Sequence, residues 1–302
     1  SKFHKLAQTR GQQGIGISAS VLYGQLTTGK PATVLTKTDP HKKAYGCKVK
    51  IDTIKNAPDV SDSHEEEWED KDHGTRIEID LEGSYHKGRQ GVDEYLKQTA
   101  IVNPHATIIY TDPTAEQIIF PRVAQSLPPE AREIKPHPYG VELGILMKMM
   151  QQSTEKTLGA FLKNSFERVS PKTMKEICEN SALLPTMKLK AMSREHADKL
   201  MRGIERSKIM APPTDCISPI TAELLEKGLR KEINAEYYCS TTRSAAVYRG
   251  NPFIIEAAMA YGGDQPSDKS VRVMRFANRV PLLYQQGACC ITTAVQQTAW
   301  RS

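Results

Sequence analysis

A glycine-rich stretch near the start of the chain has the residue types for binding an anion. Gly11, Gly14 and Gly16 are spaced G-x-x-G-x-G and lead directly into residues 17–22, whose apolar residues have helical spacing. The first N–H groups of a helix have no partner inside the helix, and glycine lets a phosphate approach the main chain closely. The stretch therefore predicts an anion site, although the same glycines also fit a turn that binds nothing.

Two common nucleotide-binding loops do not match this stretch. The dinucleotide loop has the spacing G-x-G-x-x-G and follows a strand, whereas residues 2–10 are polar and basic without strand-like alternation. A Walker loop needs a Lys-Ser or Lys-Thr pair after its last glycine, and Ile17 and Ser18 stand there instead.

A second group of candidate residues is basic and lies on a predicted helix or just before it. Ser193 can cap this helix, and Ala197, Leu200, Met201 and Ile204 have the spacing of its buried face. Basic side chains on the other face either contact nucleic-acid phosphates or form a solvated face, because acidic residues are interspersed among them. The candidate DNA contacts are Lys188, Lys190, Arg194, Lys199, Arg202 and Arg206.

The elements that would position the glycine stretch indicate a mixed α/β (α+β) fold. The helix after the glycines should end near Gly29 and Pro31, since glycine can form the left-handed cap and proline cannot continue a helix. Alternating residues predict half-buried strands, and the acidic run at 65–70 is typical of a solvated loop. We expect strands at 32–38, 47–51 and 77–81, the third opening at 74–75, a charged loop at 55–73, a helix at 91–101 and a hairpin at 106–120.

The remaining chain divides into a helical region and a second mixed region. In the helical region, about 140–211, Ser170 and Pro171 mark the start of a helix running to about Glu179. In the mixed region, about 212–302, Leu224, Leu225 and Leu229 predict a helix. We expect strands at 245–248 and 253–257 and a turn at 261–264.

Composition limits the class of protein. With 302 residues, 25% charged and 39% hydrophobic, the chain is long enough for two or three globular domains, and the net charge of +6 permits a nucleic-acid partner. No apolar run is long enough for a membrane span and no signal peptide precedes the glycines, so a cytoplasmic protein is expected. The six cysteines include no C-x-x-C pair, so we expect reduced thiols and no zinc site.

Longer strings carry a resemblance to a known family. The segment SKFHKLAQTRGQQGIGISASVLYGQLTTGKP resembles the ATP lid of the B subunits of archaeal type IIB DNA topoisomerases (topoisomerase VI), which are GHKL-type ATPases. The strings PHATIIYTDPT, FPRVAQSLPPEAREIKPHPYGVELG, PPTDCISPI, VYRGNPFIIEAAMAYGG and RFANRVPLLYQQGACCIT resemble the same protein in the same order. The resemblance covers essentially the whole chain.

The resemblance implies a division into three domains and a set of nucleotide contacts. Residues 1–139 would be the C-terminal part of the GHKL (Bergerat) ATPase domain, 140–211 a helix-two-turns-helix domain, and 212–302 an incomplete transducer domain rich in βαβ units. A threonine in the context of Thr75 lies near adenine in GHKL proteins, although a β-branched strand residue is the simpler interpretation. The implied ATP contacts are Ser1, Lys2, Gly11, Gln12, Gln13, Gly14, Ile15, Gly16, Ile17, Ser18 and Thr75.

The implied activity is that of the ATPase component in an A2B2 topoisomerase. ATP and Mg2+ would close a dimer of B subunits while the A subunit cleaves both strands of one duplex so that another can pass. The magnesium asparagine, the catalytic glutamate and the D-x-G-x-G box of the family do not occur here, so the chain resembles an internal fragment and should not hydrolyse ATP by itself. Another GHKL ATPase, such as a MutL-like protein, and a non-catalytic DNA- or protein-binding fragment remain alternatives.

Overall fold

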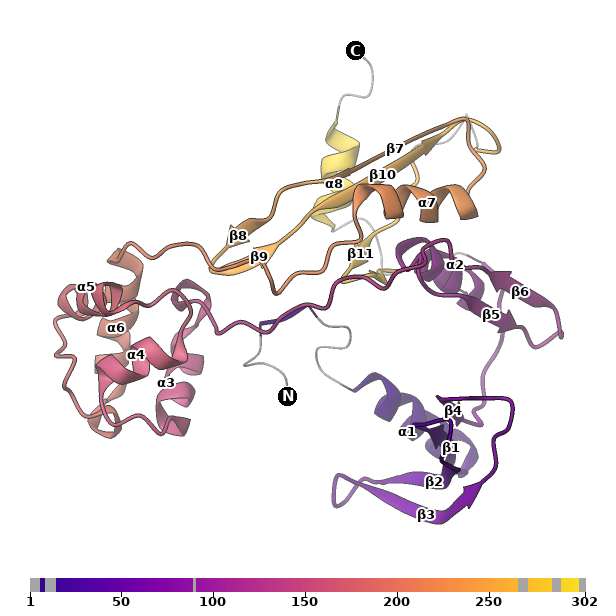
Figure 1. The fold of residues 1–302 in the computed structure, drawn as a ribbon, viewed down its shortest axis with the longest axis horizontal. Helices are drawn as coiled ribbons and strands as arrows, with labels where there is room; N and C mark the ends of the chain where they lie inside the picture. The colour runs from indigo at the N-terminus through magenta and orange to yellow at the C-terminus, as the bar shows by residue number, and fades with distance from the viewer. Residues whose placement is uncertain (1–5, 9–14, 89–90, 266–270, 284–288, 299–302) are drawn as a thin grey trace. The chain divides into compact units, whose positions relative to one another are not determined.

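The computed structural model describes residues 6–8, 15–88, 91–265, 271–283 and 289–298 (Figure 1). The chain forms two compact units. The first contains the described residues from 15 to 86, and the second contains residues 6–8 and the described residues from 87 onward. Together they confirm a mixed helix and sheet protein.

The first unit is an antiparallel sheet with one helix packed on it. The strand order is β3-β2-β1-β4, and α1 contacts β1 and β2. Gly29 follows the helix in the left-handed conformation (φ 74°), as the sequence predicts, because its N–H must turn back to the Gln25 carbonyl. The elements are α1 (Gly16–Thr28), β1 (Ala32–Lys37), β2 (Ala44–Asp52), β3 (Ala57–Glu66) and β4 (Gly74–Glu78).

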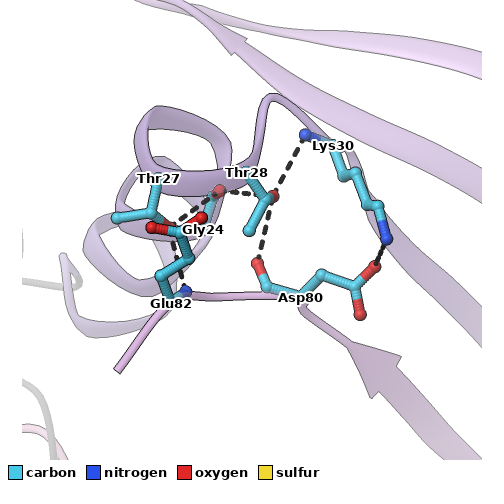
Figure 2. A network of polar contacts seen from close by, with 6 residues as sticks. All are labelled: Gly24, Thr27, Thr28, Lys30, Asp80 and Glu82. Carbon is cyan, nitrogen blue, oxygen red and sulfur yellow. Dashed lines mark hydrogen bonds and ion pairs between the residues drawn. The ribbon is translucent and has the colours of Figure 1, made fainter. Parts of the chain in front are cut away.

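The C-terminal half of α1 is fixed to the chain that follows β4 (Figure 2). The Thr27 hydroxyl accepts a hydrogen bond from the Glu82 N–H (3.3 Å), and the Thr28 hydroxyl donates to the Asp80 carbonyl (3.4 Å). Gly24 permits this close approach, since a Cβ there would lie 2.6 Å from the Asp80 carbonyl oxygen. Lys30 adds an ion pair to the Asp80 carboxylate at 2.8 Å.

Two predictions for this unit were wrong. The acidic segment predicted as a loop contains β3, which pairs with β2, and 74–75 therefore opens a fourth strand rather than a third. Main-chain hydrogen bonds to β2 hold this edge strand, and its carboxylates remain exposed to solvent. The predicted half-buried strand at 77–81 ends at Glu78, and Ile77 and Leu81 are exposed.

Helices form one end of the second unit. Their core contains the fully buried Leu146, Phe161, Ile177 and Leu200, and a hydrophobic cluster links all four helices. This confirms the helical character predicted for the middle region. The elements are the 3-10 turn η1 (Pro138–Gly140), α3 (Leu143–Gln152), α4 (Leu158–Ser165), α5 (Pro171–Ser181), the 3-10 turn η2 (Leu189–Ala191) and α6 (Arg194–Arg206).

The rest of the second unit combines hairpins with three helices. Here α2 and α7 pack closely, because Gly228 has no side chain to meet the Ile101 carbonyl, and α7 lies along the β7–β10 pair (Figure 1). The elements are α2 (Val92–Val102), β5 (Ile108–Thr111), β6 (Gln117–Phe120), α7 (Ala222–Glu232), β7 (Tyr237–Thr242), β8 (Ala246–Tyr248), β9 (Asn251–Phe253), β10 (Glu256–Tyr261), β11 (Phe276–Ala277), β12 (Val280–Pro281) and α8 (Cys290–Gln297).

The strand pattern of this region differs from the prediction. The predicted strand at 253–257 is two strands, β9 and β10, separated at residues 254–255, and β7 was not predicted. Every strand pair in the described part of 212–302 is antiparallel, so a βαβ crossover, which needs a parallel pair, is not seen there. The turn at 261–264 is confirmed, with Gly262 and Gly263 both at positive φ.

Candidate nucleotide and nucleic-acid sites

The N-terminal turn of α1 carries the described part of the candidate nucleotide site. Residues 15–20 are all exposed, and Ile15 precedes the helix without a side-chain cap. The N–H groups of Gly16, Ile17 and Ser18 come before the first intrahelical bond, which the Ala19 N–H makes to the Ile15 carbonyl at 2.8 Å. The first turn has no acidic residue that would oppose an anion at the positive end of the helix dipole.

The helix is held firmly at its other end. The side chain of Gln25 accepts a hydrogen bond from the Ile51 N–H (2.8 Å) and donates to the Ile51 carbonyl (3.1 Å), so it joins α1 to β2 like a short piece of strand. Because these hydrogen bonds fix the helix, an anion at its N-terminus would meet a fixed set of amides. The sequence does not reveal the roles of Gln25 and Gly24, because their partners are distant along the chain.

Thr75 lies on β4, directly opposite Thr36 of β1. The two hydroxyl oxygens are 3.1 Å apart and share a hydrogen bond, and the Thr75 residue is exposed. This geometry agrees with a β-branched residue that stabilises a strand pair and leaves a contact to a base as a prediction. Ser1, Lys2, Gly11, Gln12, Gln13 and Gly14 lie outside the described residues.

The basic candidates surround a helix pair whose local signals are clear. Ser170 caps α5 by accepting from the Thr173 N–H, and Ser193 caps α6 by accepting from the His196 N–H, as predicted. The His196 Nδ1 accepts a hydrogen bond from the Ser193 N–H at 3.1 Å, which completes a capping box that was not predicted. The predicted inner face of α6 is buried except for Met201, which is half-buried.

All six basic candidates are exposed, but two of them are already paired. Lys199 binds Glu195 at 2.9 Å, and Arg202 binds Asp198 at 2.9 Å, each four residues earlier on α6. The hydrogen bond from Lys199 lowers the pKa of the Glu195 carboxyl. Such exposed pairs are weak, so a phosphate can displace them. Lys188 and Lys190 are exposed before α6, Arg194 is exposed as its first residue, and Arg206 is exposed as its last.

The described ranges hold neither a metal cluster nor a membrane-spanning helix. Among these residues, no group of three or more His, Cys, Asp or Glu side chains is placed to hold a metal ion. The helices found there are too short or too polar to cross a membrane. Each cysteine is a free thiol, which agrees with the reduced state predicted from their spacing.

The known proteins that this chain resembles are named as B subunits of the same class of DNA topoisomerase. The transducer family of the topoisomerase VI B subunit matches residues 212–302. Over its whole length the chain is 49% identical to the B subunit of type 2 DNA topoisomerase 6 from Methanococcoides burtonii and 47% identical to that from Methanosarcina barkeri, covering 48% of each. It is 43% identical to the corresponding protein from Archaeoglobus fulgidus, of which it covers 50%.

The chain thus spans about half the length of the curated relatives it matches. The similarity extends across all 302 residues, so it includes the glycine stretch, α5 and α6 as well as the transducer. By these comparisons the chain is similar throughout to B subunits of type 2 DNA topoisomerase 6, and its residues 212–302 match the transducer family of that subunit.

Proposed function

We propose that this chain is part of the ATP-binding component of a type IIB DNA topoisomerase. The observation that carries the proposal is the 49% identity, over every residue of the chain, to a protein named as the B subunit of type 2 DNA topoisomerase 6. In the complete protein, ATP would close two B subunits into a gate, and an A subunit would cleave the duplex through which another passes.

The proposal divides the chain into three parts with different tasks. Residues 1–139 would belong to the GHKL ATPase domain, 140–211 would form a helix-two-turns-helix domain, and 212–302 would be the transducer. The four-helix core and the capped helices α5 and α6 support a helical part with a core of its own inside the second unit. The match of 212–302 to the transducer family supports the third part.

The nucleotide part of the proposal depends on the helix terminus. The exposed N-terminus of α1, without an acidic residue in its first turn, fits the phosphates of ATP. Main-chain N–H groups from Gly16 to Ser18 would bind them, and the Ser18 hydroxyl would add a donor. Ligands for Mg2+ are expected in other parts of the family's ATPase domain, and we assign none here.

The test compares two substitutions of Ile17 in the complete B subunit. The Ile17 side chain is 53% exposed, so Ile17→Glu and Ile17→Gln both fit without repacking. The carboxylate of Ile17→Glu should interact favourably with the positive end of the helix dipole, but it should repel the phosphates of the nucleotide. At low ionic strength, where this repulsion is little screened, the Kd for a non-hydrolysable ATP analogue should rise by up to about tenfold for Ile17→Glu relative to Ile17→Gln.

The same titration can be read out by nucleotide-dependent dimerisation in analytical ultracentrifugation. Ile17→Gln should dimerise at the analogue concentration of the wild type, and Ile17→Glu should need up to about tenfold more. Equal affinity of the two variants for the analogue would show that the N-terminus of α1 is not part of the nucleotide site. Dimerisation without any nucleotide effect would instead favour a non-catalytic binding module.

A further inference from the structure

The short turn at 137–140 lies between the C-terminal end of α6 and the β8–β9 hairpin. It contacts the end of the helix through side chains and the hairpin through its backbone and the His137 ring, and all the residues involved lie in the second unit. The turn precedes α3, so it connects the helical region to the chain before it.

Two side chains of the turn bind the end of α6. The Tyr139 hydroxyl donates to the Ser207 carbonyl and accepts from the Ile209 N–H at 3.1 Å. The His137 Nε2 lies 2.9 Å from the Met210 carbonyl. Ser207, the C-cap of α6, also receives a hydrogen bond from the Asn180 side chain at 2.9 Å, which joins α5 to the same point.

The other side of the turn is in contact with the tip of the hairpin. Arg249 and Gly250 both have positive φ (46° and 73°) in a two-residue loop, as in a type I′ turn. A Cβ on Gly250 would lie 2.8 Å from the Gly140 nitrogen, and a Cβ on Gly140 would lie 2.7 Å from the Arg249 carbonyl oxygen. The two backbones therefore meet directly, with the His137 side chain also packed against Gly250.

We propose that this turn couples α6 to the β8–β9 hairpin of the transducer, so that a displacement of α6 moves the hairpin. A tight backbone contact on one side and direct hydrogen bonds of the His137 and Tyr139 side chains on the other transmit displacement, because each contact is short and has no water or further side chain between the partners. That the coupling passes the effect of DNA bound at α6 to the transducer is an idea that rests on the proposed function. The coupling itself does not need DNA.

The test measures amide hydrogen exchange in the complete B subunit. Tyr139→Phe removes only the hydroxyl, so the Ile209 N–H loses its acceptor while the ring stays. Without DNA, exchange should be about two- to tenfold faster in peptides covering 203–210 and also in peptides covering 246–253, as expected for the loss of a hydrogen bond. Because coupling is reciprocal, Gly250→Ala should accelerate exchange at 207–210.

Tyr45→Phe is the matched control. It removes a tyrosine hydroxyl bond of the same kind, from Tyr45 to Ser63 at 2.8 Å between β2 and β3, and should leave both peptides at wild-type rates. Faster exchange at 203–210 with an unchanged hairpin in Tyr139→Phe would overturn the coupling. If Gly250→Ala unfolds the protein, Tyr139→Phe still decides the question.

A second arm adds a short duplex DNA and separates this inference from the proposed function. In the wild type, DNA should slow exchange in α6 and in 246–253, whereas in Tyr139→Phe it should slow exchange in α6 alone. A hairpin that still responds in Tyr139→Phe would contradict the coupling. An α6 that never responds to DNA would refute the proposed DNA contact and leave the DNA-free result to judge the coupling.

Discussion

At the scale of single residues, His137 is the group whose charge matters most to the turn. Its side chain is 1% exposed, and both ring nitrogens are used, since Nδ1 accepts from the Tyr139 N–H (3.3 Å) and Nε2 faces the Met210 carbonyl. Only the neutral ring with a proton on Nε2 satisfies both contacts. Burial lowers the pKa of His137, with Arg168 adding to that effect, while the Met210 carbonyl and Glu167 oppose it.

This predicts a pH dependence of stability. The folded pKa lies below the unfolded value near 6.5, so the contribution is complete above pH 6.5 and is lost as the pH falls from there toward the folded pKa. His137→Asn retains an acceptor for the Tyr139 N–H but does not titrate. Between about pH 7 and pH 5, thermal unfolding should show the wild type losing stability faster than His137→Asn, by at most about 1.4 kcal/mol per pH unit.

The exposed His41 supplies the control for this comparison. His41→Asn should keep the pH dependence of the wild type. If His137→Asn has that dependence as well, the histidine does not stabilise the turn in its neutral form.

At the scale of elements, the crossing of α5 and α6 depends on Gly203. A Cβ at this position would lie 2.5 Å from the Ser181 Cβ and 2.8 Å from the Ser181 nitrogen, so the two helices would have to separate. Gly203→Ala should therefore destabilise the protein by about 1–3 kcal/mol, although alanine favours helix formation. Denaturant unfolding of the helical region measures this difference.

Gly144 is the matched helical glycine, because a Cβ there meets no atom within 4 Å. Gly144→Ala should leave stability unchanged or raise it by up to about 1 kcal/mol. A Gly203→Ala variant as stable as Gly144→Ala would show that the crossing tolerates a wider spacing.

Elements with local signals were predictable from the sequence, and elements made by distant partners were not. Ser170, Ser193 and Gly29 act on amides or carbonyls within a few residues, so α5, α6 and the end of α1 were predicted close to their observed bounds. Strand β3 exists because β2 lies beside it, and its composition argues for a loop. Tyr139 likewise acquires its role from residues 68 and 70 positions later in the chain, and Gly250 from the backbone of the turn, which spacing alone does not reveal.

At the scale of the whole molecule, the positive net charge attracts DNA without showing which part of the surface the duplex contacts. Each Lys→Glu or Arg→Glu change removes two units of charge, so any three such changes bring the formal net charge of this chain from +6 to zero. General attraction to DNA then falls equally for any triple variant. A difference between two triple variants reports where the duplex lies.

We expect the triple variant Lys199→Glu, Arg202→Glu, Arg206→Glu to bind duplex DNA more weakly than the control triple Lys42→Glu, Lys43→Glu, Lys55→Glu in the first unit. If all three α6 residues contact phosphates, the slope of log K against log salt should become less steep by up to about 2.7 units. Fluorescence anisotropy over a salt series measures both slopes. Identical slopes in the two variants would place the duplex away from α6.

The two edges of the first unit's sheet are not equivalent, and this bears on aggregation. At the β3 edge, the register shifts between Gly46 and Lys48, and Asp62 has a positive φ of 50°, so the strand is bent as well as rich in carboxylates. Such an edge resists the addition of a foreign strand. The β4 edge is short but regular, and it exposes Ile77. We therefore expect edge-to-edge aggregation to occur at β4 rather than at β3. A covering segment or a charged substitution at β4 would protect the protein.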